Sequence, residues 1–188
     1  MSYAGQEVEN KVTGEQVVVV TGTDETNGEL GVYDLTVAPG GAVAGEHIHP
    51  HIEERFTVIK GKVGFRLDGV EQIAPADETI TISSGVAHDW WNAGDQVALV
   101  RIEVRPAARF EQLILNLFGL ANDGKTNSKG MPNPLQLAIL GKEFQDVIMF
   151  TSPPPLVQKI MFSVVAPIAG LLGYQGTYGE YTSIIDKK

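Results

Sequence analysis

Cysteine is absent from this chain of 188 residues. The sequence therefore excludes disulfide bonds, a cysteine nucleophile and thiolate metal sites, so any bound metal must use nitrogen and oxygen ligands. Basic residues are also few, with 14 against 23 acidic residues and a formal net charge of −9. No basic cluster is longer than the lysine pair at 187–188. Because an acidic surface repels phosphate backbones, no nucleic-acid partner is expected.

Long hydrophobic runs are missing as well. The polar segment 1–16 lacks the apolar core of a signal peptide, which predicts a cytoplasmic location. The most apolar stretch, 160–172, has 13 residues, whereas a helix needs about 20 to span a bilayer. We therefore expect this stretch to be buried against the rest of the chain or a second subunit. Contact with a membrane surface is the alternative.

What the chain does contain indicates a packed fold with many turns. Hydrophobic residues make up 43% of the sequence, which also has 21 glycines and 10 prolines. This apolar content is too high for a disordered chain. The length suits one ordinary domain, or a domain of roughly 100 residues followed by a substantial extension.

Residues 16–105 read as short strands separated by turns. Alternation of apolar and polar residues, with glycine, proline or aspartate at the breaks, predicts an all-β sandwich or barrel. The predicted strands are 17–20, 32–37, 56–59, 63–67, 79–82 and 97–104.

After Pro106 the hydrophobic period changes from that of strands to that of helices. Apolar residues recur at three- and four-residue spacing, which predicts helices over 107–122, 134–150 and 156–172. We expect these helices to be packed rather than to form a flexible appendage.

The chain has four histidines, His47, His49, His51 and His88, and three of them alternate along one segment. In an extended chain alternate side chains share a face, so His47 and His49 point the same way. Glu54 can join them after a short bend, and His88 follows another strand. Three imidazoles and one carboxylate form a plausible site for iron, manganese, nickel, copper or zinc.

The spacing around these residues resembles the first motif of the cupin superfamily. Gly41 is followed after five residues by His47 and His49, then after four residues by Glu54, and after six more by Gly61. The resemblance covers residues 16–105, with a short distance between motifs like that of single-barrel cupins.

The second cupin motif is matched in its core, where Gly85, two residues, His88, three residues and Asn92 follow the pattern. Two turn positions depart from it. Asp77 stands where the motif opens with glycine, and Ser83 stands where it has proline. Both departures concern the geometry of turns rather than the ligand set.

The resemblance implies a mainly β fold, a cupin jelly-roll barrel (a double-stranded β-helix), over residues 1–105. Residues 106–188 then form a C-terminal helical extension packed on the barrel or on a dimer partner. It also implies one divalent metal ion inside the barrel, with two coordination positions open to water, dioxygen or a chelating substrate. Similar barrels are commonly homodimers. The implied ligands are His47, His49, Glu54 and His88.

Two neighbours of these residues leave alternatives open. Glu53 could compete with Glu54, but Glu54 shares its parity with the apolar Phe56 and Val58 and fits the spacing to Gly61. His51 matches no ligand position of the family. It is either a residue at the rim of the site or a proton shuttle or substrate contact.

Three functions remain open at this level. The first is a metal-dependent oxygenase, lyase or isomerase acting on a small, partly apolar molecule, with Glu54 or His51 moving a proton. The second is a module that binds such a molecule without turning it over. The third is a scaffold whose helical extension contacts a partner or a membrane surface. Cupins include all these classes, so the fold does not choose among them.

Overall fold

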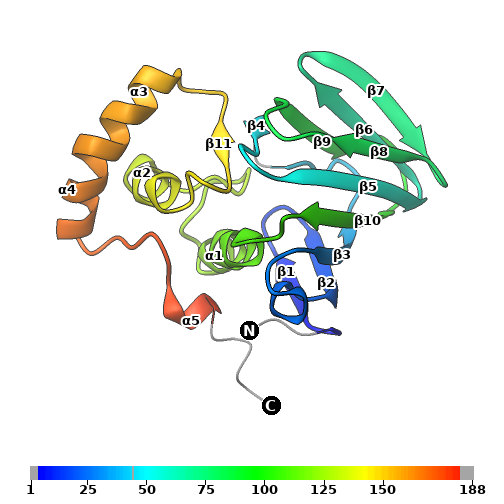
Figure 1. Ribbon diagram of the computed structural model, residues 1–188, viewed down its shortest axis with the longest axis horizontal. Coiled ribbons are helices and arrows are strands. Elements are labelled where there is room, and N and C mark those ends of the chain that lie inside the picture. The colour runs from blue at the N-terminus through cyan, green and yellow to red at the C-terminus, as the bar shows by residue number, and fades with distance from the viewer. Residues whose placement is uncertain (1–3, 44, 183–188) are drawn as a thin grey trace.

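The computed structural model describes residues 4–43 and 45–182 and shows two antiparallel sheets followed by helices (Figure 1). This confirms the prediction of a mainly β fold with C-terminal helices. In spatial order the six-stranded sheet contains β1 (Glu7–Asn10), β2 (Glu15–Thr21), β3 (Gly31–Val37), β10 (Ala98–Arg105), β5 (Glu53–Lys60) and β8 (Thr79–Ile82). The five-stranded sheet contains β11 (Met149–Phe150), β4 (His47–Ile48), β9 (His88–Asn92), β6 (Lys62–Leu67) and β7 (Val70–Pro75).

All six predicted strands are present, and the structure adds β1, β4, β7, β9 and β11. These additional strands carry little hydrophobic alternation. β7 is mostly exposed, and β9 buries His88 and Asn92 beside Trp90. Because polar residues take inward positions in β9, a pattern of apolar residues could not reveal it.

Turns between these strands depend on backbone conformations with positive φ. Gly61 has φ of 87° between β5 and β6, and a Cβ there would lie 3.0 Å from the backbone of Ala98. Asp77, which departs from the cupin motif, has φ of 71°. Aspartate tolerates the left-handed region better than most residues, so this turn keeps its shape without glycine.

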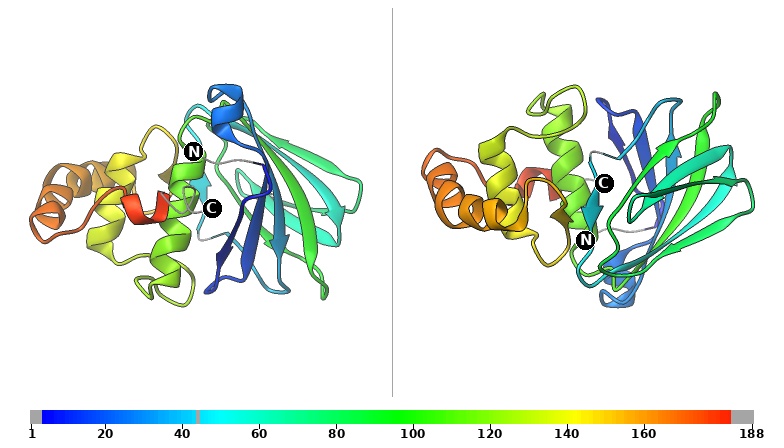
Figure 2. Two further views of the ribbon diagram at one scale, coloured as in Figure 1. Left: turned by 90° about the horizontal axis from the view of Figure 1, so that it is seen from below. Right: turned by 90° about the horizontal axis from the view of Figure 1, so that it is seen from above.

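The helices lie at one end of the sandwich in successive layers (Figure 2). α1 (Phe110–Asn122) lies against the strands and α2 (Pro134–Glu143) packs beyond it. The outermost layer is a continuous helical segment of α3 (Pro155–Ile160), η2 (Met161–Val165) and α4 (Ala166–Leu171). The chain also has a short 3-10 helix, η1 (Thr23–Thr26), and a final turn of helix, α5 (Gly179–Thr182).

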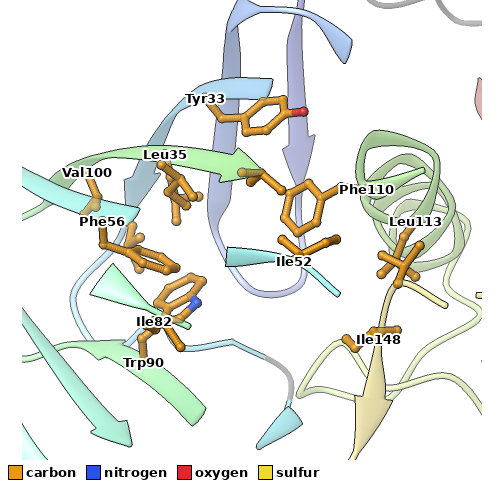
Figure 3. Close-up of a cluster of buried hydrophobic side chains, with 14 of the residues drawn as sticks. Tyr33, Leu35, Ile52, Phe56, Ile82, Trp90, Val100, Phe110, Leu113 and Ile148 are labelled. Atoms are coloured by element: carbon orange, nitrogen blue, oxygen red, sulfur yellow. The ribbon is translucent and has the colours of Figure 1, made fainter. Parts of the chain in front are cut away.

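α1 closes the open end of the sandwich with apolar side chains. Figure 3 shows Phe110 between Tyr33 and Ile52, with Leu113 and Ile148 on the helical side. All five are buried and belong to the same hydrophobic core as the strands. The core therefore runs without a break from the barrel into the extension.

The helix predicted over 134–150 was wrong at its C-terminal end. α2 stops at Glu143, and Met149 and Phe150 form β11, which pairs with Ile48 and His47 of β4. The run around Val147 is short and apolar, and such a run is typical of either a strand or a helix. Tertiary pairing decided between them.

The prediction that 160–172 is buried against the rest of the chain is wrong for one face of this segment, while burial against a second subunit stays a prediction. One face of the outermost helical segment, called here the outer helix face, is exposed to solvent. Leu171 is 89% exposed and Leu156 is 70% exposed. The outer helix face consists of Leu156, Val157, Ile160, Val164, Ile168, Leu171 and Leu172. Within the residues described, no helix has the length and apolar character needed to cross a membrane.

Candidate metal centre

Four residues of the predicted ligand set meet between the two sheets. His47 lies on β4 and faces His88 of β9 across the ladder, His49 follows β4 directly, and Glu54 lies on β5 of the other sheet. One donor atom from each lies within 4.8 Å of the donor atoms of the other three. Each of the four residues is buried, with exposed fractions of 1–4%. The four predicted residues therefore lie together, while their binding of a metal stays a prediction.

Backbone carbonyls orient all three imidazoles. The Nδ1 atom of His47 lies 3.0 Å from the carbonyl oxygen of Gly45, and that of His88 lies 3.0 Å from Val86. The Nδ1 atom of His49 lies 2.6 Å from the carbonyl of Val147. A carbonyl oxygen only accepts hydrogen bonds, so each Nδ1 carries a proton. The lone pair of each Nε2 is therefore the one that can coordinate a metal ion. Metal-binding histidines are typically fixed in this way.

The remaining contacts within the cluster involve Glu54. Its Oε2 atom lies 3.0 Å from the Nε2 of His88 and 3.4 Å from that of His49. The Nε2 of His49 is fully buried and has no hydrogen-bond partner among the described residues. A buried nitrogen without a partner is rare in folded proteins and needs an explanation. A cation bound to this lone pair supplies one.

Charge within the cluster is arranged to receive a cation. Burial lowers the pKa of His47 to about 3, with the neighbouring histidines adding to the effect, so this imidazole is neutral at physiological pH. Burial alone would raise the pKa of Glu54, but His49, His88 and His47 together outweigh it and bring that pKa to about 2. Burial opposes charging of His88, yet the hydrogen bond and the charge of Glu54 leave its pKa raised.

These features fit a divalent cation. The donor set consists of nitrogen and oxygen atoms, which suits first-row transition metals. The hydrogen bond between the Nε2 of His88 and the Oε2 of Glu54 contains a proton, and a bound metal ion can replace that proton. The cluster is thus consistent with a metal centre, while the identity of the ion is not specified by its donors.

Glu54 and Glu53 lie on opposite faces of β5, as the alternation of side chains along a strand predicts. β5 buries Glu54, Phe56 and Val58 and exposes Glu53. His51 lies on the bend between β4 and β5 and is exposed. The four-residue cluster does not include it. A proton-shuttle role for His51 therefore stays a prediction.

Val147 is a contributor that sequence analysis missed. It stands 98 residues after His49, in the segment between α2 and β11, and its backbone carbonyl holds the imidazole. No sequence signal could have found it, because any residue type supplies the same carbonyl group. The helical extension thus helps to build the centre of the barrel.

A mostly apolar cavity of about 120 Å³ adjoins the cluster beneath α1. Three cluster residues, His47, His49 and Glu54, form part of its wall. Such a cavity, with a few polar groups in an apolar lining, is typical of small-molecule sites. The apolar wall includes Val17, Val19, Leu35, Phe56, Phe110 and Leu113.

Comparison with known proteins agrees with this description. A relative from Streptomyces glaucescens, the tetracenomycin polyketide synthase protein TcmJ, is 30% identical over 109 residues. The match covers 58% of this chain and 64% of TcmJ, so the chain spans a little under two thirds of that relative's length.

Two solved structures are similar to this one at low identity. A predicted oxalate decarboxylase from Thermotoga maritima is 16% identical, has a TM-score of 0.48, and is matched over 55% of this chain and 93% of its own. KdgF from Halomonas sp. is also 16% identical with a TM-score of 0.48, over 56% of this chain and 94% of its own.

The family model described as a cupin domain matches residues 33–104. This region runs from β3 to β10 and contains all four cluster residues. Its two antiparallel sheets and its motif spacing are those that the resemblance predicted. Residues 33–104 form a cupin domain, and in this chain helices follow it.

Proposed function

We propose that this protein is a metal-dependent enzyme that binds one divalent ion through His47, His49, Glu54 and His88 and acts on a small, partly apolar molecule in the adjoining cavity. The observation that carries the proposal is the buried, unpartnered Nε2 of His49 at the cavity wall. A protein that only needed a packed core would gain stability by replacing such a group.

The reaction class that we propose is that of an oxygenase, or of a related lyase or isomerase. When bound, the ion would supply Lewis acidity and a template for substrate oxygens. The chain's own contribution is to exclude water with Phe110 and α1 and to present the Glu54 carboxylate, which can hold or move a proton at Oε2. The relative named as a polyketide synthase protein supports a carbon-rich, polyketide-type substrate.

A combined experiment tests metal binding and turnover. Purified protein is analysed for metals, then incubated with polyhydroxylated naphthalenes in air and without oxygen, and the products are examined by mass spectrometry. Oxygen-dependent gain of mass indicates an oxygenase, loss of a fragment a lyase, and a new isomer at unchanged mass an isomerase. Binding without any product would contradict the enzymatic proposal and favour a binding module.

The choice of glutamate gives a sharper prediction. We expect Glu54→Gln to weaken metal binding by about 10–100-fold or more, since it removes an anionic donor that lies 3.0 Å from His88. Glu53→Gln, its exposed neighbour, is the matched control and should bind metal like the wild type. Metal titrations monitored by calorimetry measure the affinity of both variants. The opposite order would show that the ligand comes from the other face of β5.

We further propose that the protein is a homodimer joined through the outer helix face. Its apolar residues recur at three- and four-residue spacing, and residues 160–179 carry no charge. Monomers seldom expose apolar patches of more than a few hundred Å². Two chains of net charge −9 repel each other elsewhere, so an uncharged face is where they can approach closely.

Sedimentation tests the dimer. We expect the wild type to sediment as a dimer at micromolar concentration and the double variant Ile160→Glu/Ile168→Glu as a folded monomer, because two buried charges in each chain would oppose association. Val70→Glu is the control, because Val70 is 70% exposed and belongs to β7, which lies on the opposite side of the molecule from α4 (Figure 1). A monomeric wild type, or a dimer broken only by Val70→Glu, would contradict the proposed interface.

A further inference from the structure

Most polar groups that line the cavity are used within the fold. The Tyr33 hydroxyl donates to Glu111 at 2.9 Å. The Thr13 hydroxyl donates to Glu15 at 2.5 Å. The side-chain oxygen of Asn10 accepts hydrogen bonds from two backbone amides of the following turn, at 3.0 and 3.2 Å. These polar groups therefore have hydrogen-bond partners within the protein and do not require a ligand to supply one.

Gln6 is the exception on the β1 side of the cavity. It is 7% exposed, and its side-chain oxygen is buried with no hydrogen-bond partner in the described part of the chain. Its backbone carbonyl accepts from Val19 at 2.9 Å, which fixes this residue at the start of β1. Of the described residues that line the cavity, Gln6 and His49 each have such an unpartnered atom.

The two unpartnered atoms belong to opposite walls. His49 follows β4 in the five-stranded sheet, whereas Gln6 immediately precedes β1, the edge strand of the six-stranded sheet. The wall between them is apolar and includes Val19, Leu35 and Phe110. A molecule that satisfies both atoms must therefore have an apolar body with a polar group at each end.

We propose that Gln6 is a specificity-determining residue, whose side-chain carbonyl accepts a hydrogen bond from a hydroxyl or N–H group on the apolar body of the ligand. The ligand is then a hydroxylated or amino-substituted ring system held at two points, by the metal centre and by Gln6. The metal-bound end rests on the proposed function, while the role of Gln6 rests on its own unpartnered oxygen.

The first test needs no ligand. Gln6→Met keeps the length of the side chain and removes the buried carbonyl, so the metal-free protein should become more stable, with an unfolding midpoint higher by roughly 2–6 °C. Glu7→Met, at the exposed neighbouring position of β1, is the control and should leave the midpoint unchanged. A lower midpoint in Gln6→Met would show that Gln6 serves the fold, and would overturn the proposal.

The second test uses defined compounds on zinc-loaded protein, since zinc is redox-inert. 2,3-Dihydroxynaphthalene is compared by calorimetry with isomers that carry a third hydroxyl on the far ring. We expect at least one isomer to bind the wild type about tenfold more tightly than the parent compound, the equivalent of one net hydrogen bond. In Gln6→Met this preference should disappear, while the affinity for the parent compound is kept.

Zinc stoichiometry separates the two proposals. If the wild type binds no zinc, the metal proposal fails, and the unfolding midpoint alone decides the role of Gln6. If zinc binds but the wild type shows no preference for a third hydroxyl, or if Gln6→Met keeps that preference, the role of Gln6 is overturned.

Discussion

Elemental analysis of the purified wild type should find about one divalent ion per chain, and His49→Ala and His88→Ala should each lose nearly all of it. Each substitution removes one of four buried donors from the cluster. Loss of a group that merely orients a ligand already costs about 10–100-fold in affinity, so loss of a donor should cost more. Adding a chelator should lower the unfolding midpoint of the wild type but leave that of His49→Ala unchanged.

His51→Ala is the matched control, since it removes a histidine from the same segment at an exposed position outside the cluster. It should keep the full metal content. Circular dichroism must accompany His88→Ala, because that change leaves Glu54 buried without its hydrogen-bond partner and destabilises the fold as well. Full metal occupancy in the double variant His49→Ala/His88→Ala would rule out this centre.

Phe144→Ala should lower both the free energy of unfolding and the affinity for metal. The side chain is completely buried just after α2, and truncating a phenylalanine in such a place costs about 3–5 kcal/mol. The backbone carbonyl of Phe144 accepts hydrogen bonds from Val147 and Ile148. A cavity here should therefore let the segment shift, and the Val147 carbonyl with it, so that His49 is held less firmly.

Urea unfolding and metal titration of the same preparation measure the two effects. Ile73→Ala is the control, because it removes a similar apolar bulk from a position on β7 that is 60% exposed and lies outside the outer helix face. It should change the free energy of unfolding little and leave metal affinity intact. If Phe144→Ala is destabilised yet binds metal as tightly as the wild type, the extension does not position His49.

The sequence predicted the barrel strands and the candidate donors because both depend on local alternation. Side chains two residues apart share a face of a strand, so the pattern groups His47 with His49, and Glu54 with Phe56 rather than with Glu53. The spacing of the two cupin motifs added His88 from a distant turn. The periods of 2 and 3.6 residues also separated the barrel from the helical region, although not at every boundary.

The sequence could not predict which groups meet across long separations. β11 pairs with β4, and the carbonyl of Val147 reaches His49 across 98 residues, through a backbone group that every residue type possesses. Side-chain chemistry alone likewise did not single out Gln6, whose oxygen matters only because its neighbours leave it unpartnered.

The candidate donors could thus be predicted from the sequence by itself: alternation along one segment groups His47, His49 and Glu54, and the resemblance to the cupin motifs implies His88. The orientation of the donors, the closure of the cavity by Phe110 and the exposure of the outer helix face were decided only by the tertiary structure. Those features depend on how the extension packs against the end of the sandwich. Packing of this kind is set by the complementarity of whole surfaces, and no local pattern of residues records it.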